Sequence, residues 1–140
     1  MSFREKSAWV MALLMAGTGL VYAWLVARIS SAMGETAPPL AAAVPYVLAV
    51  VVGAIVLQTG LALLSPREAS APADERERGI IDRAGHWSGV VLAAGLAVAL
   101  AHFLIVGDGR MLFHLALGAM IVGQVAEHVL EIALFRRRSF

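Results

Sequence analysis

Four long stretches of apolar residues, separated by short polar segments, dominate the pattern of the chain. They cover residues 9–27, 40–64, 87–106 and 111–135. Each is close to the roughly 20 residues that a helix needs to cross about 30 Å of hydrocarbon. None shows the alternating pattern that spanning β-strands of about ten residues would have. The pattern therefore predicts an all-α integral membrane protein, a four-helix bundle.

The polar segments set the expected ends of the helices. We expect helices over about 7–29, 40–64, 75–106 and 111–135, in a single membrane domain of residues 1–140. The third begins before its apolar stretch, because apolar residues recur at helical spacing from Ile80 onward. The turn over 107–110 contains two glycines and an aspartate, so it predicts an antiparallel hairpin of the last two helices. Residues 65–86 form the expected cytoplasmic linker, and its first part, with Pro66 and Pro72, reads as flexible.

Composition narrows the class of protein. Hydrophobic residues make up 60% of the chain and charged residues 15%, and the mean hydropathy is +0.80. Soluble domains are about 45–50% apolar and about 25% charged. The 11 basic residues nearly balance the 10 acidic ones, so there is no net field to attract nucleic acid. Because the chain has no cysteine, disulfides and thiolate metal sites are excluded. The expected surroundings are a lipid bilayer.

Basic residues are divided unevenly between the two sides of the predicted membrane. Nine lie on the side of the two termini and the linker, and two lie on the other side. Because an excess of Lys and Arg marks the cytoplasmic side, we expect both termini to be cytoplasmic. The nine are Arg4, Lys6, Arg67, Arg76, Arg78, Arg83, Arg136, Arg137 and Arg138, and the two are Arg28 and Arg110.

Small residues recur every four positions along the predicted third helix. Such residues let helix backbones approach closely in lipid, where hiding apolar surface gains nothing. The row serves either packing within one bundle, which is the commoner use, or a homodimer interface. It comprises Gly85, Gly89, Ala93, Ala97 and Ala101.

The predicted fourth helix carries the two charged residues that fall inside the apolar stretches, Glu127 and Glu131. At about 100° per residue, they share about a third of the helix circumference with Gln124 and His128. Because ionisable groups are costly in hydrocarbon, this face is expected to point toward protein or water. The candidate ion or proton site is therefore Gln124, Glu127, His128 and Glu131.

Three interpretations of this cluster remain open. In the first and most common, Glu127 bonds to a neighbouring helix while His128 and Glu131 reach the membrane surface. In the second, the cluster relays a proton. In the third, two carboxylates and an imidazole hold a divalent cation, as in the metal sites of helix bundles.

Histidine spacing raises a haem hypothesis. His114 and His128 share a face of the fourth helix, and the hairpin places His86 level with His128 and His102 level with His114. This arrangement suits bis-histidine ligation. However, His86 and His102 are 16 residues apart and face opposite ways on the third helix. We therefore predict no cofactor and keep haem as an alternative.

Motifs of common enzyme classes do not occur: there is no nucleophile elbow, phosphate loop, zincin motif or dinucleotide fingerprint. We expect a protein without enzymatic activity. The charged linker is either a docking site for a protein partner or the solvated start of a helix, with ion pairs from Arg78 to residues four positions away on each side. Gln58 is expected to hydrogen-bond between helices. The docking candidates are Asp74, Glu75, Arg76, Glu77 and Arg78.

Several of these segments resemble a group of small, uncharacterised bacterial inner-membrane proteins with four helices. The similar segments are SFREKSAWV at 2–10, SPREA at 65–69, DERERGIID at 74–82, the Ala126-Glu127 pair and the basic ending at 135–138. The resemblance implies a bacterial inner-membrane location and four helices. It implies no activity and no catalytic residue.

These patterns favour a small inner-membrane protein that acts as an interaction or assembly component. One alternative is a proton- or cation-coupled transport or channel protein that uses the Glu/His cluster. The other is a haem-binding membrane electron carrier. The expected partners are the bilayer, a second copy through the third helix, or a cytoplasmic or membrane protein, and not nucleic acid.

Overall fold

The computed structural model describes residues 2–137, which form helices joined by short connections and contain no strand. The four long helices are each long and apolar enough to cross a membrane, so the predicted all-α four-helix membrane protein is confirmed. Arg138, which belongs to the predicted basic ending, lies outside the described residues. The helices are α1 (Phe3–Met33), α2 (Pro39–Leu64), α3 (Pro66–Ala69), α4 (Glu75–Val106) and α5 (Gly109–Arg137).

Local capping explains where the helices begin and end. The Ser2 hydroxyl accepts a hydrogen bond from the Glu5 amide, so α1 starts a full turn earlier than expected. The Asp74 carboxylate caps α4 in the same way, at 2.6 Å from the Glu77 amide. Gly34 and Gly107 end α1 and α4 with φ angles of 70° and 73°, a conformation that favours glycine. The short helix α3 falls within the part of the linker expected to be flexible, and the sequence pattern did not predict it.

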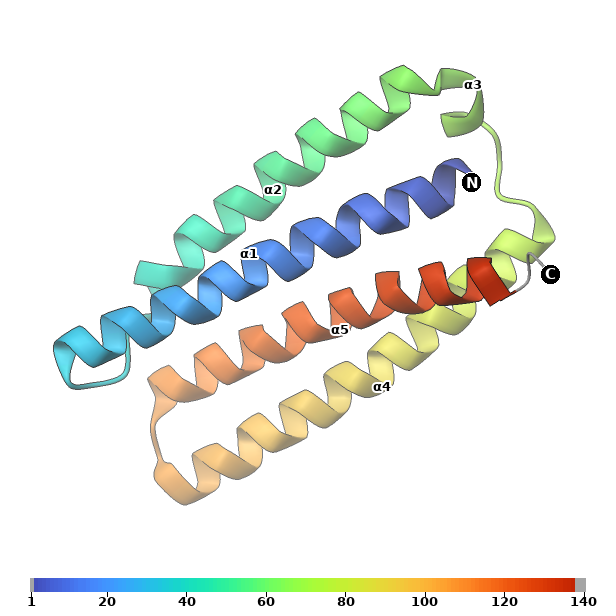
Figure 1. Ribbon diagram of the computed structural model, residues 1–140. Helices are drawn as coiled ribbons and strands as arrows, with labels where there is room; N and C mark the ends of the chain where they lie inside the picture. The colour runs from blue at the N-terminus through green and yellow to red at the C-terminus, as the bar shows by residue number, and fades with distance from the viewer. Residues whose placement is uncertain (1, 138–140) are drawn as a thin grey trace.

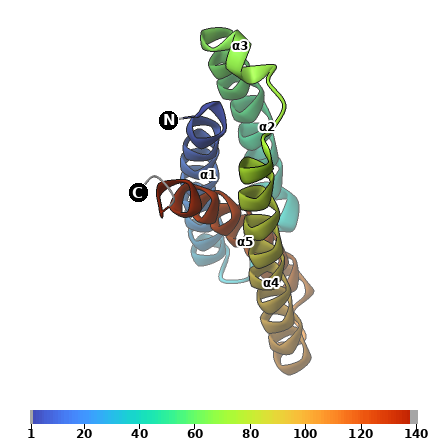
Figure 2. The same ribbon diagram turned by 90° about the vertical axis from the view of Figure 1, so that its right-hand side faces the viewer.

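The long helices follow one another across the molecule in the order α2, α1, α5, α4 (Figure 1). Extensive packing joins α1 to α2, α1 to α5, and α4 to α5. The row is bent rather than flat when it is seen from the side (Figure 2). The middle of the row is therefore α1 and α5, and α4 forms one of its edges.

Glycines lie at each of these three helix contacts. A Cβ added at Gly53 of α2 would lie 2.8 Å from a Leu14 methyl of α1. One added at Gly19 of α1 would lie 2.6 Å from Ile121 of α5. One added at Gly95 of α4 would lie 2.6 Å from the Ala119 Cβ of α5. The helices thus approach to distances that only glycine permits, as expected for packing in lipid.

Polar contacts tie the beginning of α1 to its neighbours. The predicted interhelical bond of Gln58 is confirmed, because its amide bonds to the Ser7 hydroxyl at 2.9 and 3.0 Å. The Arg136 guanidinium of α5 lies 5.2 Å from the Trp9 ring centroid. Two ion pairs complete the set: Arg4–Glu77 at 3.1 Å and Lys6–Glu68 at 3.7 Å. We call this end of the molecule, where α1 begins and α5 ends, the terminal end.

Candidate functional site

The row of small residues on α4 lies on the exposed face of the helix. Gly89, Ala93, Ala97 and Ala101 are exposed, and Gly85 is half-buried. A Cβ added at Gly85 or Gly89 would meet nothing within 4 Å. The predicted packing of this row within one chain is therefore wrong. The reason is that the opposite face of α4 carries a second set of small residues, namely Ala84, Ser88, Gly95 and Ala99. Three of them are buried, and a Cβ added at the fourth, Gly95, would meet Ala119 of α5.

Two opposite charges continue the exposed row at its terminal end. Arg78 and Asp82 lie on the same face of α4 as Gly89 and Ala93 by helical spacing, and both are exposed. The ion pairs expected between Arg78 and its neighbours four residues away do not form in the described chain. Asp74 instead caps the helix, and Asp82 has no charged partner among residues 2–137. The row therefore ends in two opposite charges, Arg78 and Asp82, neither of which forms an ion pair within residues 2–137.

The carboxylates of α5 divide into two separate contacts. Glu127 accepts a hydrogen bond of 3.3 Å from the Ser88 hydroxyl of α4, as the interpretation of a bond to a neighbouring helix expects. His128 and Glu131 pair through Nδ1 and Oε2 at 3.2 Å, and their side chains are only 16% and 13% exposed. Gln124 is exposed and belongs to neither contact.

The His128–Glu131 pair faces a small polar pocket at the terminal end. The pocket has a volume of about 170 Å³, and Arg4 and Ser7 of α1 also line it. Within residues 2–137, no three His, Asp or Glu side chains converge in a way that could hold a metal ion. The acidic cluster thus consists of one interhelical contact, from Glu127 to Ser88, and one contact within α5, between His128 and Glu131, which line the pocket.

The four histidines have different surroundings. His86 is exposed and packs edge-on against Trp87. His102 is half-buried, and its Nδ1 has no hydrogen-bond partner in the described chain. His114 uses both ring nitrogens in protein hydrogen bonds, so ligation of haem through it would break one of them.

A buried polar network lies at the opposite end of the molecule, and the sequence pattern did not predict it. Tyr22 lies near the end of α1 that precedes the loop over 34–38, a position where a tyrosine is typical of an interfacial anchor. It is instead 3% exposed, and its hydroxyl lies 2.5 Å from Nδ1 of His114, which is 6% exposed. His114 also bonds through Nε2 to the Ala37 carbonyl at 2.9 Å. We call this end, which carries the loop over 34–38 and the turn over 107–108, the loop end.

Charged contacts fasten the same loop to the start of α5. The Thr36 hydroxyl donates to the Asp108 carboxylate, and Arg110 Nη1 donates to Glu35 Oε1 at 2.8 Å. Asp108 also accepts from the backbone amides of Arg110 and Met111. The hydrogen bond from Thr36, followed by these amide bonds, holds the pKa of Asp108 below its ordinary value of 3.8. The carboxylate is therefore the form that fits this site.

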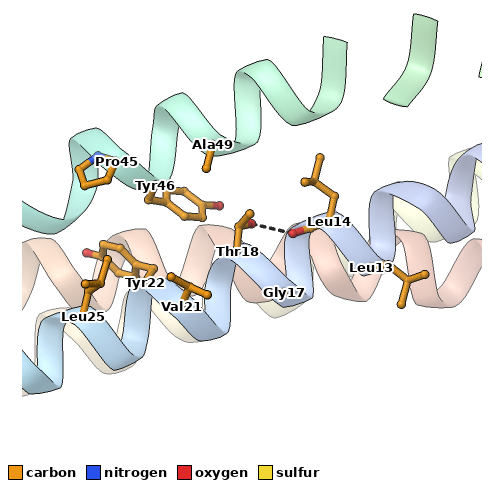
Figure 3. Close-up of a pocket in the computed structure, with 10 residues that line it drawn as sticks. All are labelled: Leu13, Leu14, Gly17, Thr18, Val21, Tyr22, Leu25, Pro45, Tyr46 and Ala49. Carbon is orange, nitrogen blue, oxygen red and sulfur yellow. Dashed lines mark hydrogen bonds between the residues drawn. The ribbon is translucent and has the colours of Figure 1, made fainter. Parts of the chain in front are cut away.

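Two apolar grooves flank α1. The first, of about 480 Å³, lies between α1 and α2, where the rings of Tyr22 and Tyr46 lie next to each other with their hydroxyls pointing in opposite directions (Figure 3). Its one side-chain hydrogen bond among the residues drawn runs from Thr18 to the Leu14 carbonyl (Figure 3). The second, of about 720 Å³, lies between α1 and α5. Both grooves are lined mainly by apolar side chains, and the polar side chains that line the second are Tyr22, Ser30 and His114.

Comparisons with protein-family models, with curated proteins and with solved structures find no match for this chain. The resemblance to small bacterial inner-membrane proteins consequently stays a prediction.

Proposed function

We propose that this chain is a non-enzymatic assembly component of a bacterial inner membrane, with both termini in the cytoplasm. It associates through the exposed face of α4 with a second copy of itself. The membrane location rests on the four apolar helices, and the orientation rests on the nine-to-two division of basic residues. The assignment to a bacterial inner membrane rests on the resemblance to small inner-membrane proteins described above.

The observation that carries the proposal is the unused row on α4. Each extensive contact between neighbouring long helices includes a glycine, at Gly19, Gly53 or Gly95. Gly89 and the alanines that continue its row have the same pattern, yet all are exposed, and within residues 2–137 a Cβ added at Gly89 would meet nothing within 4 Å. Because helices in lipid associate where small residues let backbones approach, this face suits contact with another helix.

Charge supports a second copy as the partner. In a parallel two-fold pair of α4 helices equivalent residues lie level, so Arg78 of one copy is about 6 Å along the axis from Asp82 of the other, within reach of the long arginine side chain. Both residues are exposed and lack an ion pair in the described chain, so such a pair would satisfy two opposite charges at once. A two-fold contact uses the same patch on both copies, which a self-complementary face of this kind permits.

Cysteine crosslinking tests the association, because the natural chain has no cysteine. Ala93→Cys and Ala97→Cys are expected to form disulfide-linked dimers on mild oxidation in membranes. A disulfide requires Cβ atoms about 3.5–4.5 Å apart, so the reaction reports direct contact. Ala94→Cys is the matched control, since residue 94 is also an exposed alanine but lies about 100° around the helix from residue 93.

The outcomes separate the possibilities sharply. Rapid dimers of the Ala93 and Ala97 variants, with at least several-fold slower reaction at Ala94, would support the proposal. Charge reversal adds a second criterion: Arg78→Glu and Asp82→Arg should each weaken the dimer, and the double variant should restore it. If the three cysteine variants react equally, or if none reacts, association of two copies through α4 is refuted.

A further inference from the structure

The loop between α1 and α2 is fastened to the start of α5 through a histidine. Ala37, at the centre of the loop, is fully buried. Its amide donates to the Ser30 hydroxyl at 2.9 Å, and its carbonyl lies 2.9 Å from Nε2 of His114. These bonds hold the α1–α2 hairpin against the α4–α5 hairpin at the loop end.

The two hydrogen bonds of His114 define which ring nitrogen carries the proton. A carbonyl oxygen only accepts, so Nε2 must be the protonated nitrogen that donates to Ala37. In the neutral ring Nδ1 is then an acceptor, and the Tyr22 hydroxyl donates to it. The closed loop therefore fits a neutral histidine of one tautomer.

A second proton on the ring conflicts with this arrangement. Nδ1 would become a donor, so the Tyr22 hydroxyl would have to turn and accept from it, and the proton of the tyrosine would lose the acceptor that it has in the described chain. The positive charge would lie in a site where both side chains are more than nine-tenths buried. Burial of a charge without a contacting counter-ion is costly, whereas water stabilises it.

The groups around the ring do not supply such a counter-ion. From α1 it meets Tyr22, and from the loop the Ala37 carbonyl. On α5 the neighbouring ring is Phe113, and α2 contributes Tyr46, which packs against Tyr22. The nearby charged groups are Asp108, which bonds to Thr36, and Glu35 and Arg110, which pair with each other. On α4, the titratable residue nearest to the loop end is His102.

We infer that the loop over 34–38 is a latch that acid releases through protonation of His114. With the ring neutral, the loop is closed and the hairpins are joined. With the ring protonated, the loop leaves α5 and the ring reaches water on the loop-end side of the membrane. The inference is independent of dimer formation through α4.

The expected size of the effect follows from one proton. If opening takes up a single proton, the ratio of open to closed molecules rises by at most about tenfold for each unit of pH that is lowered. An imidazole exposed to water changes its charge within the range of about pH 5 to 8, so the comparison of pH 7.5 with pH 5.5 covers the range in which opening is sought. The Asp108 carboxylate does not contribute in this range, because its pKa lies below 3.8.

Thiol labelling measures the opening directly. In purified protein in detergent, the Ala37→Cys thiol is buried when the latch is closed, so its maleimide labelling rate reports the open fraction. Ala32→Cys is an exposed reference in the last turn of α1, just before the loop, and corrects for the pH dependence of the thiol itself. The ratio of the two rates should rise several-fold as the pH falls from 7.5 to 5.5. Hydrogen exchange of the Ala37 amide in the unmodified chain should follow the same course.

Two substitutions identify the histidine responsible. His114→Gln keeps a donor for Ala37 and an acceptor for Tyr22 but does not titrate, so it should abolish the pH dependence. His102→Gln changes the other histidine toward this end and should leave the pH dependence intact. A labelling ratio and an amide exchange rate that do not change with pH in the wild-type background would overturn the inference. So would a pH dependence that persists in His114→Gln or disappears in His102→Gln. If His114→Gln fails to fold, Tyr22→Phe decides: it removes the donor to Nδ1 and should move the transition to higher pH, and an unmoved transition refutes the latch.

Discussion

The contact between α4 and α5 is predicted to depend on the absence of a single methyl group at Gly95. A Cβ at this position would lie 2.6 Å from the Ala119 Cβ and 3.3 Å from its Cα. The second of these atoms belongs to the backbone, so no rotation of a side chain relieves the overlap. The helices would have to separate by about 1 Å to restore ordinary contact near 3.5–4.0 Å. We therefore expect Gly95→Ala to destabilise the protein.

The magnitude follows from two opposing effects. Overpacking of this kind costs typically about 1–3 kcal/mol, partly because a gap of about 1 Å forfeits a quarter to a half of each neighbouring dispersion contact. Alanine offsets up to about 1 kcal/mol through its higher helix propensity. The net expectation is a loss of about 1–2 kcal/mol in the free energy of unfolding, measured by reversible unfolding in mixed micelles.

Gly118→Ala is the matched control on the partner helix. It makes the same substitution one residue before Ala119, but its added Cβ would meet nothing within 4 Å. It should leave stability unchanged or raise it by up to about 1 kcal/mol. Equal effects at positions 95 and 118 would show that helix propensity, and not the close approach of α4 and α5, governs both positions, and the reasoning would fail.

Two further predictions concern polar contacts at the opposite ends of the molecule. The bond between Thr36 and Asp108 should stabilise the folded protein above pH 3.8, and this stabilisation should be lost as the pH falls below that value, since the pKa of Asp108 is lowered in the folded state. Asp108→Asn should remove this acid dependence of the free energy of unfolding. If the variant shows the same acid dependence as the wild type, the prediction is wrong. The Ser7–Gln58 bond should give a coupling energy of about 0.5–1.5 kcal/mol in a double-mutant cycle of Ser7→Ala and Gln58→Leu; additive effects would show that the contact contributes nothing.

The sequence predicted the long helices because length and hydropathy decide whether a segment crosses a bilayer. The bounds of α4 at Glu75–Val106 agree with expectation. The helix α1 begins at Phe3 and not near residue 7, because the Ser2 cap adds a turn before the apolar stretch. Periodicity did not determine which of the two small-residue faces of α4 meets α5. Both faces have residues of suitable size, and only the shape of α5 around Ala119 and Gly123 distinguishes them.

The network at the loop end was missed for a different reason. Tyr22 and His114 are separated by 92 residues, and neither lies in a motif. A tyrosine near the end of an apolar helix is typical of an interfacial anchor, so its burial against a histidine could not be read from its position. The predicted turn over 107–110 was the one feature of the sequence that pointed to polar contacts in this region. It placed Asp108 and Arg110 at the loop end, but not against Thr36 and Glu35.

The distribution of polar groups also bears on the alternative of a proton or cation pathway. The terminal end has Glu127 and the His128–Glu131 pair, and the loop end has Tyr22 and His114. Between Glu127 and His114, α5 has 12 residues without an ionisable side chain, a rise of about 20 Å. The Thr18 hydroxyl in the middle of α1 bonds to its own helix at Leu14, and Gln124 is exposed. A relay needs donors and acceptors within hydrogen-bond reach of one another. Within the described part of α5, the ionisable groups therefore form two layers, near the two ends of the helix, with an apolar layer of 12 residues between them.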